Sequence, residues 1–127
     1  MALFSELTAH GGILRAALTG TAKRHEVISN NIANADVPGF VGSRVEFEEA
    51  LIEAVGNYPR PSNRTVDVSG VVPTVHLQNP GFLNRLDGNH IDIETEMVRL
   101  YQNSMRFETI HSAIMANSQR MSTVWGQ

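Results

Sequence analysis

The side chains best suited to chemistry in this sequence are histidines and carboxylates, because the chain contains no cysteine. His90, Asp92 and Glu94 alternate within five residues and are of the types that bind metal ions. At the start of a helix, however, alternation spreads such side chains around the axis, and Asp is a preferred N-cap residue. We therefore expect Asp92 to cap a helix, and we predict no metal site.

Two further patterns resemble catalytic groups but fit a structural role better. Glu48 and Glu49 are adjacent carboxylates, which we interpret as the solvated face of a helix. His25 and His111 occupy positions in apolar helical repeats, so they could face each other and make an assembly sensitive to pH. The sequence has no Gly-x-Ser-x-Gly motif and no glycine-rich phosphate loop. We expect neither an enzyme nor a cofactor.

The elements that position these residues are two stretches with the same seven-residue rhythm. The rhythm alternates steps of three and four residues, which return each side chain to one helix face as in a coiled coil. We predict a mainly α fold, with an N-terminal helix over residues 10–35 and a C-terminal helix over 92–124 packed as a coiled-coil hairpin. The first seam is Leu14, Leu18, Thr21, His25, Ile28, Ile32 and Ala35, and the second is Ile93, Met97, Leu100, Ser104, Phe107, His111, Ile114, Ser118, Met121 and Trp125.

Local signals mark the ends of these helices. Residues 34–39 combine an Asn that tolerates left-handed backbone with Pro38 and Gly39, which is a stop signal for the first helix. Residues 87–89 (Asp-Gly-Asn) are typical of a turn before the second helix. Glu94 and Glu96 then place negative charge where the helix dipole favours it.

Residues 36–91 connect the two helices within a single domain, 1–127. We predict a short helix over Val45–Val55, followed by an irregular loop with β-prone pieces at Thr65–Val68 and Val71–Leu77. A loop of this length is unusual inside a compact domain. It either forms a small hairpin against a neighbouring molecule or stays mobile until a partner orders it.

The length of the second helix predicts assembly. A helix over 92–124 would be about 50 Å long, whereas a compact globule of this size is about 36 Å across. Its own chain cannot cover it, so other copies or other proteins must do so. The apolar residues left outside the two seams are Ile13, Val27, Val98, Tyr101, Ala113 and Met115.

Composition argues against several classes of partner. The net charge is −3 and the basic residues are scattered, so we expect no nucleic acid partner. No apolar run is long enough to span a membrane, and the first 14 residues lack the features of a cleavable signal. A protein of this kind that leaves the cytoplasm would need a dedicated export route.

Two segments carry a specific resemblance. Residues 28–36 (Ile-Ser-Asn-Asn-Ile-Ala-Asn-Ala-Asp), followed by Pro38-Gly39-Phe40, resemble the N-terminal signature of bacterial flagellar rod, hook and hook-associated proteins. Residues 87–97 (Asp-Gly-Asn-His-Ile-Asp-Ile-Glu-Thr-Glu-Met) resemble the start of the C-terminal helix in the proximal rod members of that family. Val37 and Val41-Gly42 depart from the usual loop sequence.

The resemblance implies a structural subunit of the proximal rod of the flagellar basal body. Such subunits polymerise through their terminal helices around a central channel, and the rod transmits torque through the periplasm. They are exported without a cleaved signal by the flagellar type III apparatus. The partners implied are further copies, other rod proteins, the adaptor protein FliE and the MS-ring protein FliF.

For the signature asparagines two roles remain open: hydrogen bonds between neighbouring segments, or simple capping by Asn34. Two other interpretations of the whole chain remain. One is a FlgC-like proximal rod protein, although residues 87–89 and the short chain argue against it. The other is a cytoplasmic helical-hairpin regulator or chaperone. The residues expected at the assembly interface are Leu14, Leu18, Ile28, Asn30, Asn31, Ile32, Asn34, Pro38, Gly39, Phe40, Asp92, Ile93, Met97, Leu100, Phe107, Ile114 and Met121.

Overall fold

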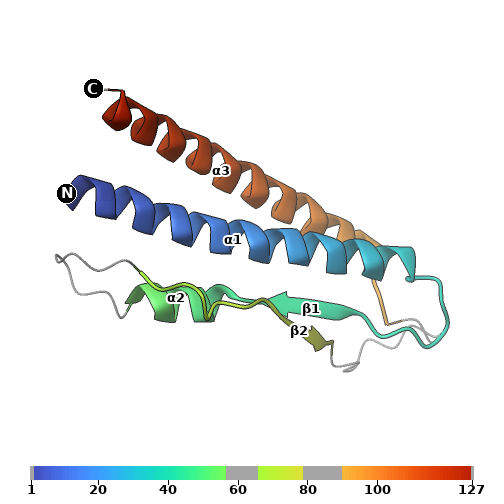
Figure 1. Cartoon of the computed structure of the whole chain (residues 1–127). Helices are drawn as coiled ribbons and strands as arrows, with labels where there is room; N and C mark the ends of the chain where they lie inside the picture. Colours follow the sequence, from blue (N-terminus) through green and yellow to red (C-terminus); the bar gives the residue numbers. More distant parts are fainter. Residues whose placement is uncertain (1, 57–65, 79–89, 127) are drawn as a thin grey trace.

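The computed structural model describes residues 2–56, 66–78 and 90–126, with side chains from residue 7 onward. Figure 1 shows the two long helices side by side with both chain termini at the same end, so the helices are antiparallel. The strands and the short helix lie on the other side of the first helix, which is therefore the middle layer. The elements in chain order are α1 (Ala2–Ala33), β1 (Ser43–Glu46), α2 (Glu48–Gly56), β2 (Thr74–Leu77) and α3 (Ile93–Trp125).

The first helix starts earlier than the sequence pattern indicated. The prediction of a start at residue 10 is wrong, because α1 begins at Ala2 and continues through Gly11 and Gly12. A glycine inside a helix costs only about 1 kcal/mol. Packing of α1 against α3 and the strands outweighs this cost. A Cβ would fit at either glycine, since it would lie 3.5 Å from Asn117 at Gly11 and 3.6 Å from Val68 at Gly12. The helix ends at Ala33, two residues before the predicted end.

The start of α3 confirms the role assigned to Asp92. One carboxylate oxygen of Asp92 accepts a hydrogen bond from the Glu94 backbone N–H at 3.1 Å, and the other accepts one from the Thr95 hydroxyl at 2.6 Å. These bonds satisfy polar groups that the first helical turn leaves free. The helix begins at Ile93 and ends at Trp125, each one residue later than predicted. The predicted turn at 87–89 lies outside the described residues.

The middle segment contains a small sheet that the sequence reading missed. Val45 was expected in a helix, but it lies on β1. Val45 and Phe47, the residue that follows β1, are both buried and pack against Val27 of α1. The helix starts only at Glu48. Of the β-prone pieces, Thr74–Leu77 forms β2 and pairs antiparallel with β1, with Val45 opposite Val75. The segment was expected either to form a hairpin against a neighbouring molecule or to stay mobile. Neither holds for β2, because this strand pairs with β1 of its own chain.

A small apolar cluster fixes the sheet and α2 against α1. Val27 of α1 packs with Val45 and Phe47, and Leu51 of α2 covers the cluster from the side. Gly20 makes this contact possible, because the Phe47 ring occupies the position that a side chain at residue 20 would need. Of the helices in the described part of the chain, none is both long and apolar enough to cross a bilayer.

Candidate assembly site

The face of α3 that contacts α1 carries polar residues at heptad spacing. Glu96, Asn103 and Asn117 lie seven and fourteen residues apart. Glu96 and Asn103 are only 3% and 2% exposed. The Asn103 amide donates to the Thr21 carbonyl oxygen at 2.9 Å, and the Asn117 amide donates to the carbonyl oxygen of Leu7 at 3.1 Å. Buried polar side chains at such positions fix the register of paired helices at the expense of stability.

This register also determines where the two seam histidines lie. Residues that lie opposite each other on two antiparallel helices have numbers with a constant sum. This sum is 124 for both hydrogen-bonded pairs, Thr21–Asn103 and Leu7–Asn117. His25 and His111 sum to 136, so they are offset by twelve residues, or about 18 Å along the helices. The expectation that they face each other is wrong within one chain. Both are exposed, and His111 stacks on Phe107 of its own helix.

Asn31 joins three elements at the closed end of the hairpin. Its side chain is completely buried, and its amide donates to the Ser43 carbonyl oxygen at 2.9 Å and to the Glu96 carboxylate at 3.1 Å. Its amide oxygen accepts from the Ser43 backbone N–H at 2.9 Å. Arg99, one helical turn further on, is paired with the same Glu96 carboxylate. This single side chain therefore connects α1, β1 and α3.

The neighbouring asparagine of the signature has a local role. Asn34 follows the last residue of α1, and its amide donates to the Asn30 carbonyl oxygen at 2.8 Å and to the Asn30 side chain at 3.1 Å. Of the two roles left open for the asparagines, Asn34 takes the capping role and Asn31 links separate segments. Gly39 follows with a φ of 75°, a left-handed conformation that favours glycine.

Arg24 is the centre of a second junction, between α1 and the corner of β1 and α2. Its guanidinium donates to the Val45 carbonyl oxygen at 2.9 Å, pairs with both Glu48 carboxylate oxygens at 2.7 and 2.5 Å, and lies 4.9 Å above the Phe47 ring centre. Partial burial by itself raises the pKa of Glu48. The Arg24 hydrogen bond and charge, with backbone N–H groups, outweigh that effect and hold the pKa below its ordinary value of 4.5.

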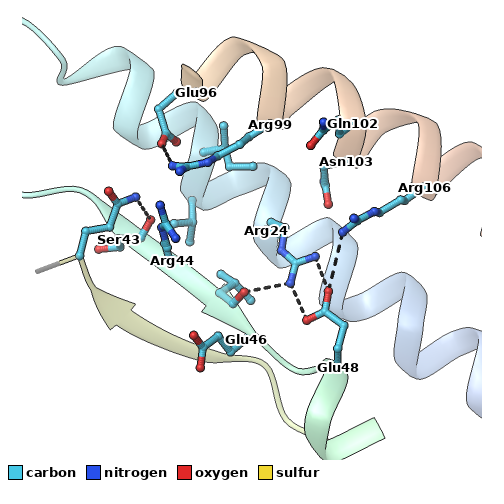
Figure 2. Close-up of a pocket in the computed structure, with 14 residues that line it drawn as sticks. Arg24, Ser43, Arg44, Glu46, Glu48, Glu96, Arg99, Gln102, Asn103 and Arg106 are labelled. Atoms are coloured by element: carbon cyan, nitrogen blue, oxygen red, sulfur yellow. Dashed lines mark hydrogen bonds and ion pairs between the residues drawn. The ribbon is translucent and has the colours of Figure 1, made fainter. Parts of the chain in front are cut away.

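A groove with a charged half and an apolar half runs along α1, between α3 on one side and β1 and α2 on the other. Figure 2 shows the charged half. The charged half is a cavity of about 270 Å³ that includes Arg24, Arg44, Arg99 and Arg106 in its lining. The apolar half, of about 580 Å³, is lined chiefly by Ala17, Phe47, Leu51, Met105 and Ile110. Glu48 and Arg106 line both halves, so the two cavities are adjacent.

The outward face of α3 exposes large apolar side chains. Met97, Val98, Tyr101 and Met105 are 59%, 57%, 69% and 54% exposed and follow one another at helical spacing. Met115 extends the apolar surface toward the C-terminal end, with 52% of its area exposed. A contiguous surface of this kind is typical of a protein interface.

The structure divides the expected interface residues into three groups. Ile28 and Asn31 are buried within the chain itself. Exposed side chains, available to a neighbour, are those of Asn30, Pro38, Asp92, Met97 and Phe107, together with Gly39. The half-buried ones are Leu14, Leu18, Ile32, Asn34, Phe40, Ile93, Leu100, Ile114 and Met121.

Sequence reasoning missed the residues that hold the hairpin in register. Glu96 was assigned only to the helix dipole, and Asn103, Asn117 and Arg24 were not singled out at all. The signal was present as a heptad of its own, at 96, 103, 110 and 117, displaced by one residue from the apolar repeat at Met97 and Ser104. An apolar rhythm alone does not report on such positions.

Comparison with known proteins gives a consistent set of relatives. The family model described as "Flagella basal body rod protein" matches residues 13–40. The flagellar basal body rod protein FlgB of Aeromonas hydrophila is 34% identical over 103 residues, which cover 77% of this chain and 78% of the relative. Its counterpart in Yersinia enterocolitica is 31% identical over 87% of this chain and 89% of the relative, and that of Bacillus subtilis is 28% identical over 87% and 88%.

Proposed function

Since the chain belongs to the FlgB family of flagellar basal body rod proteins and is a structural subunit of the rod, we propose that it lies in the proximal rod and polymerises through α1 and α3. The observation that carries this proposal is the exposed apolar surface of α3. Full burial of a large apolar side chain such as Met97 or Tyr101 by a neighbour would stabilise the contact by about 1.5–3 kcal/mol. Among the described residues, no third layer covers this side of the hairpin.

Buried and half-buried polar residues between α1 and α3 support the same proposal. Glu96, Asn103 and Asn117 form hydrogen bonds where a stable two-helix protein would bury aliphatic side chains. The contact between α1 and α3 therefore fixes register at some expense of stability. Neighbouring subunits in the polymer then supply a further part of the free energy that orders these helices.

The position in the rod implies particular neighbours and a route of delivery. We propose contacts with other rod proteins, with the adaptor protein FliE and with the MS-ring protein FliF, in a rod that crosses the periplasm and encloses a channel. Delivery would be through the flagellar type III apparatus. A chain without cysteine, whose long helices are stabilised mainly by neighbours, is easily kept unfolded during export.

Two other functions are not favoured. A FlgC-like position would fit the same helical architecture, but the relatives above are FlgB proteins. A cytoplasmic regulator or chaperone with a helical hairpin would have relatives of another kind.

Electron cryotomography of basal bodies in the native host tests the proposal. Deletion of the gene should leave MS rings without a rod, and the intact gene should restore the rod. Complete rods in the deletion strain would overturn the proposed position. Rods that are interrupted only beyond their proximal part would also overturn it.

A further inference from the structure

We propose that the groove along α1 receives helix α2 of a second copy of this chain. The inference rests on the proposed function, since it describes how subunits of the rod contact one another. Its basis is the match between the two halves of the groove and the exposed face of α2.

The charged half of the groove contains guanidinium groups that the described residues neutralise only in part. Arg24 is paired with Glu48, and Arg99 is paired with Glu96. Arg44 has no ion pair among the described residues. Arg106 has only a 4.0 Å approach to Glu48, whose carboxylate is already bound by Arg24.

Glu46, the third carboxylate in the lining, does not neutralise Arg44 or Arg106. Glu46 lies on the side of β1 away from α3 in Figure 2, 3.9 Å from His76. Four arginines and three glutamates thus line the charged half, in a chain whose net charge is −3. A neighbour with carboxylates is favoured here, because opposite charges orient protein interfaces.

Helix α2 presents the complementary side chains on the surface that faces away from its own groove. Glu49, Ile52, Glu53 and Gly56 follow at steps of three and four residues, so they share one helix face, and all four are exposed. Ile52 is 69% exposed and lies between the two carboxylates. This arrangement allows Ile52 to enter the apolar half while a carboxylate reaches Arg44 or Arg106.

The same helix contributes to the groove through its opposite face. Leu51 lines the apolar half, and Glu48 lies at the junction of the two halves. The face of α2 that inserts and the groove that receives it are therefore different patches of one molecule. Such a head-to-tail contact does not close on a pair of subunits, and it generates an open helical polymer when repeated.

Cysteine crosslinking tests the contact, because the natural chain has no cysteine to interfere. Gln102→Cys places a thiol at the groove, and Gly56→Cys places one on the exposed face of α2, where an added Cβ meets no atom within 4 Å. Strains that carry both changes in one chain, or each change alone, are treated with a short bismaleimide. Only strains that swim are scored, so that rod formation is established independently of the crosslink.

The double-cysteine chain should give a ladder of dimers, trimers and higher species on a denaturing gel, and each single-cysteine chain should remain monomeric. Three results would overturn the inference: only monomers from the double-cysteine chain in swimming cells, dimers from a single-cysteine chain, or a crosslink from Gly56→Cys to a different protein. Complete rods in cells that lack the gene altogether would instead count against the proposed function.

Charge reversal provides a second test of the same contact. Arg44→Glu and Glu53→Arg should each lower the number of complete rods about tenfold, because each places like charges opposite each other. Together in one chain they should restore most rods. A double variant as defective as either single one would contradict the pairing, provided that the purified single variants unfold at the same urea concentration as the unchanged chain.

Discussion

The Phe47 ring lies directly against the backbone of Gly20: a Cβ on this glycine would come within 2.5 Å of three ring atoms. The ring is 5% exposed and belongs to the cluster that holds β1 and α2 on α1. The absence of a side chain at residue 20 thus determines how closely the two layers approach.

Gly20→Ala should lower the free energy of unfolding by about 1–3 kcal/mol, because overpacking outweighs the better helix propensity of alanine. Urea unfolding of the purified chain, followed by circular dichroism, measures the change. Gly12→Ala is the matched control in the same helix, since its Cβ would lie at an ordinary 3.6 Å from Val68. The control should stabilise the chain by up to about 1 kcal/mol. Equal effects of the two substitutions would contradict this account.

The sequence predicted the features that neighbouring residues determine. The Asp92 cap, the stop after residue 33 and the existence of two long antiparallel helices follow from local residue types and periodicity. Residues that meet across long stretches of chain escaped prediction: Gly20 and Phe47 are far apart in the sequence, and β1 pairs with a strand almost thirty residues away. Ile28, expected at the interface with other subunits, is only 6% exposed and lines the groove between β1 and α3 within its own chain.

Asn31→Ala should lower the free energy of unfolding by about 3 kcal/mol. The change leaves the Ser43 backbone N–H and one Glu96 oxygen without a partner in a buried site. Asn30→Ala is the control, since Asn30 is exposed and bonds only to Asn34 among the described residues, and it should cost less than about 0.5 kcal/mol. Similar losses for both variants in the same urea experiment would show that Asn31 has no special role.

Stability should fall in acid partly through Glu48. The pKa of this carboxyl is below 4.5 in the folded chain, so the unfolded chain binds a proton more readily. The stabilisation by the Arg24 pair is therefore present above the unfolded pKa and is lost as the pH falls through the folded pKa. The difference in unfolding free energy between the natural chain and Glu48→Gln, measured across this range, should shrink as the pH falls. A difference independent of pH would contradict the assignment.

Asp92→Ala should destabilise the start of α3 by about 1 kcal/mol, because the Glu94 N–H and the Thr95 hydroxyl lose their acceptors. Hydrogen exchange of the amides in the first turn of α3 should become faster. Ser112→Ala, an exposed change in the middle of the same helix, should leave those amides unaffected. Unchanged exchange in Asp92→Ala would mean that the first turn is held by other contacts.

Met97→Glu with Tyr101→Glu should abolish swimming and leave the purified chain as stable as before, because both side chains are exposed in the single chain and the proposed polymer contact would bury them. Val72→Glu is the control: Val72 is 65% exposed, close to the 69% of Tyr101, but lies outside the long helices. Cells with the Val72 change should swim. Normal rods in the Met97/Tyr101 double variant would show that this face of α3 is not part of the interface.

The separation of α1 from α3 along the chain also sets the timing of folding. The ribosome completes α1 before it begins residues 34–92, and only after them does it make α3, the helix that holds α1 in register. Most of the stability of a helix in a protein comes from its tertiary partners. During synthesis α1 therefore lacks its longest partner until the last residues are made, and the nascent chain can be captured before its two long helices pair.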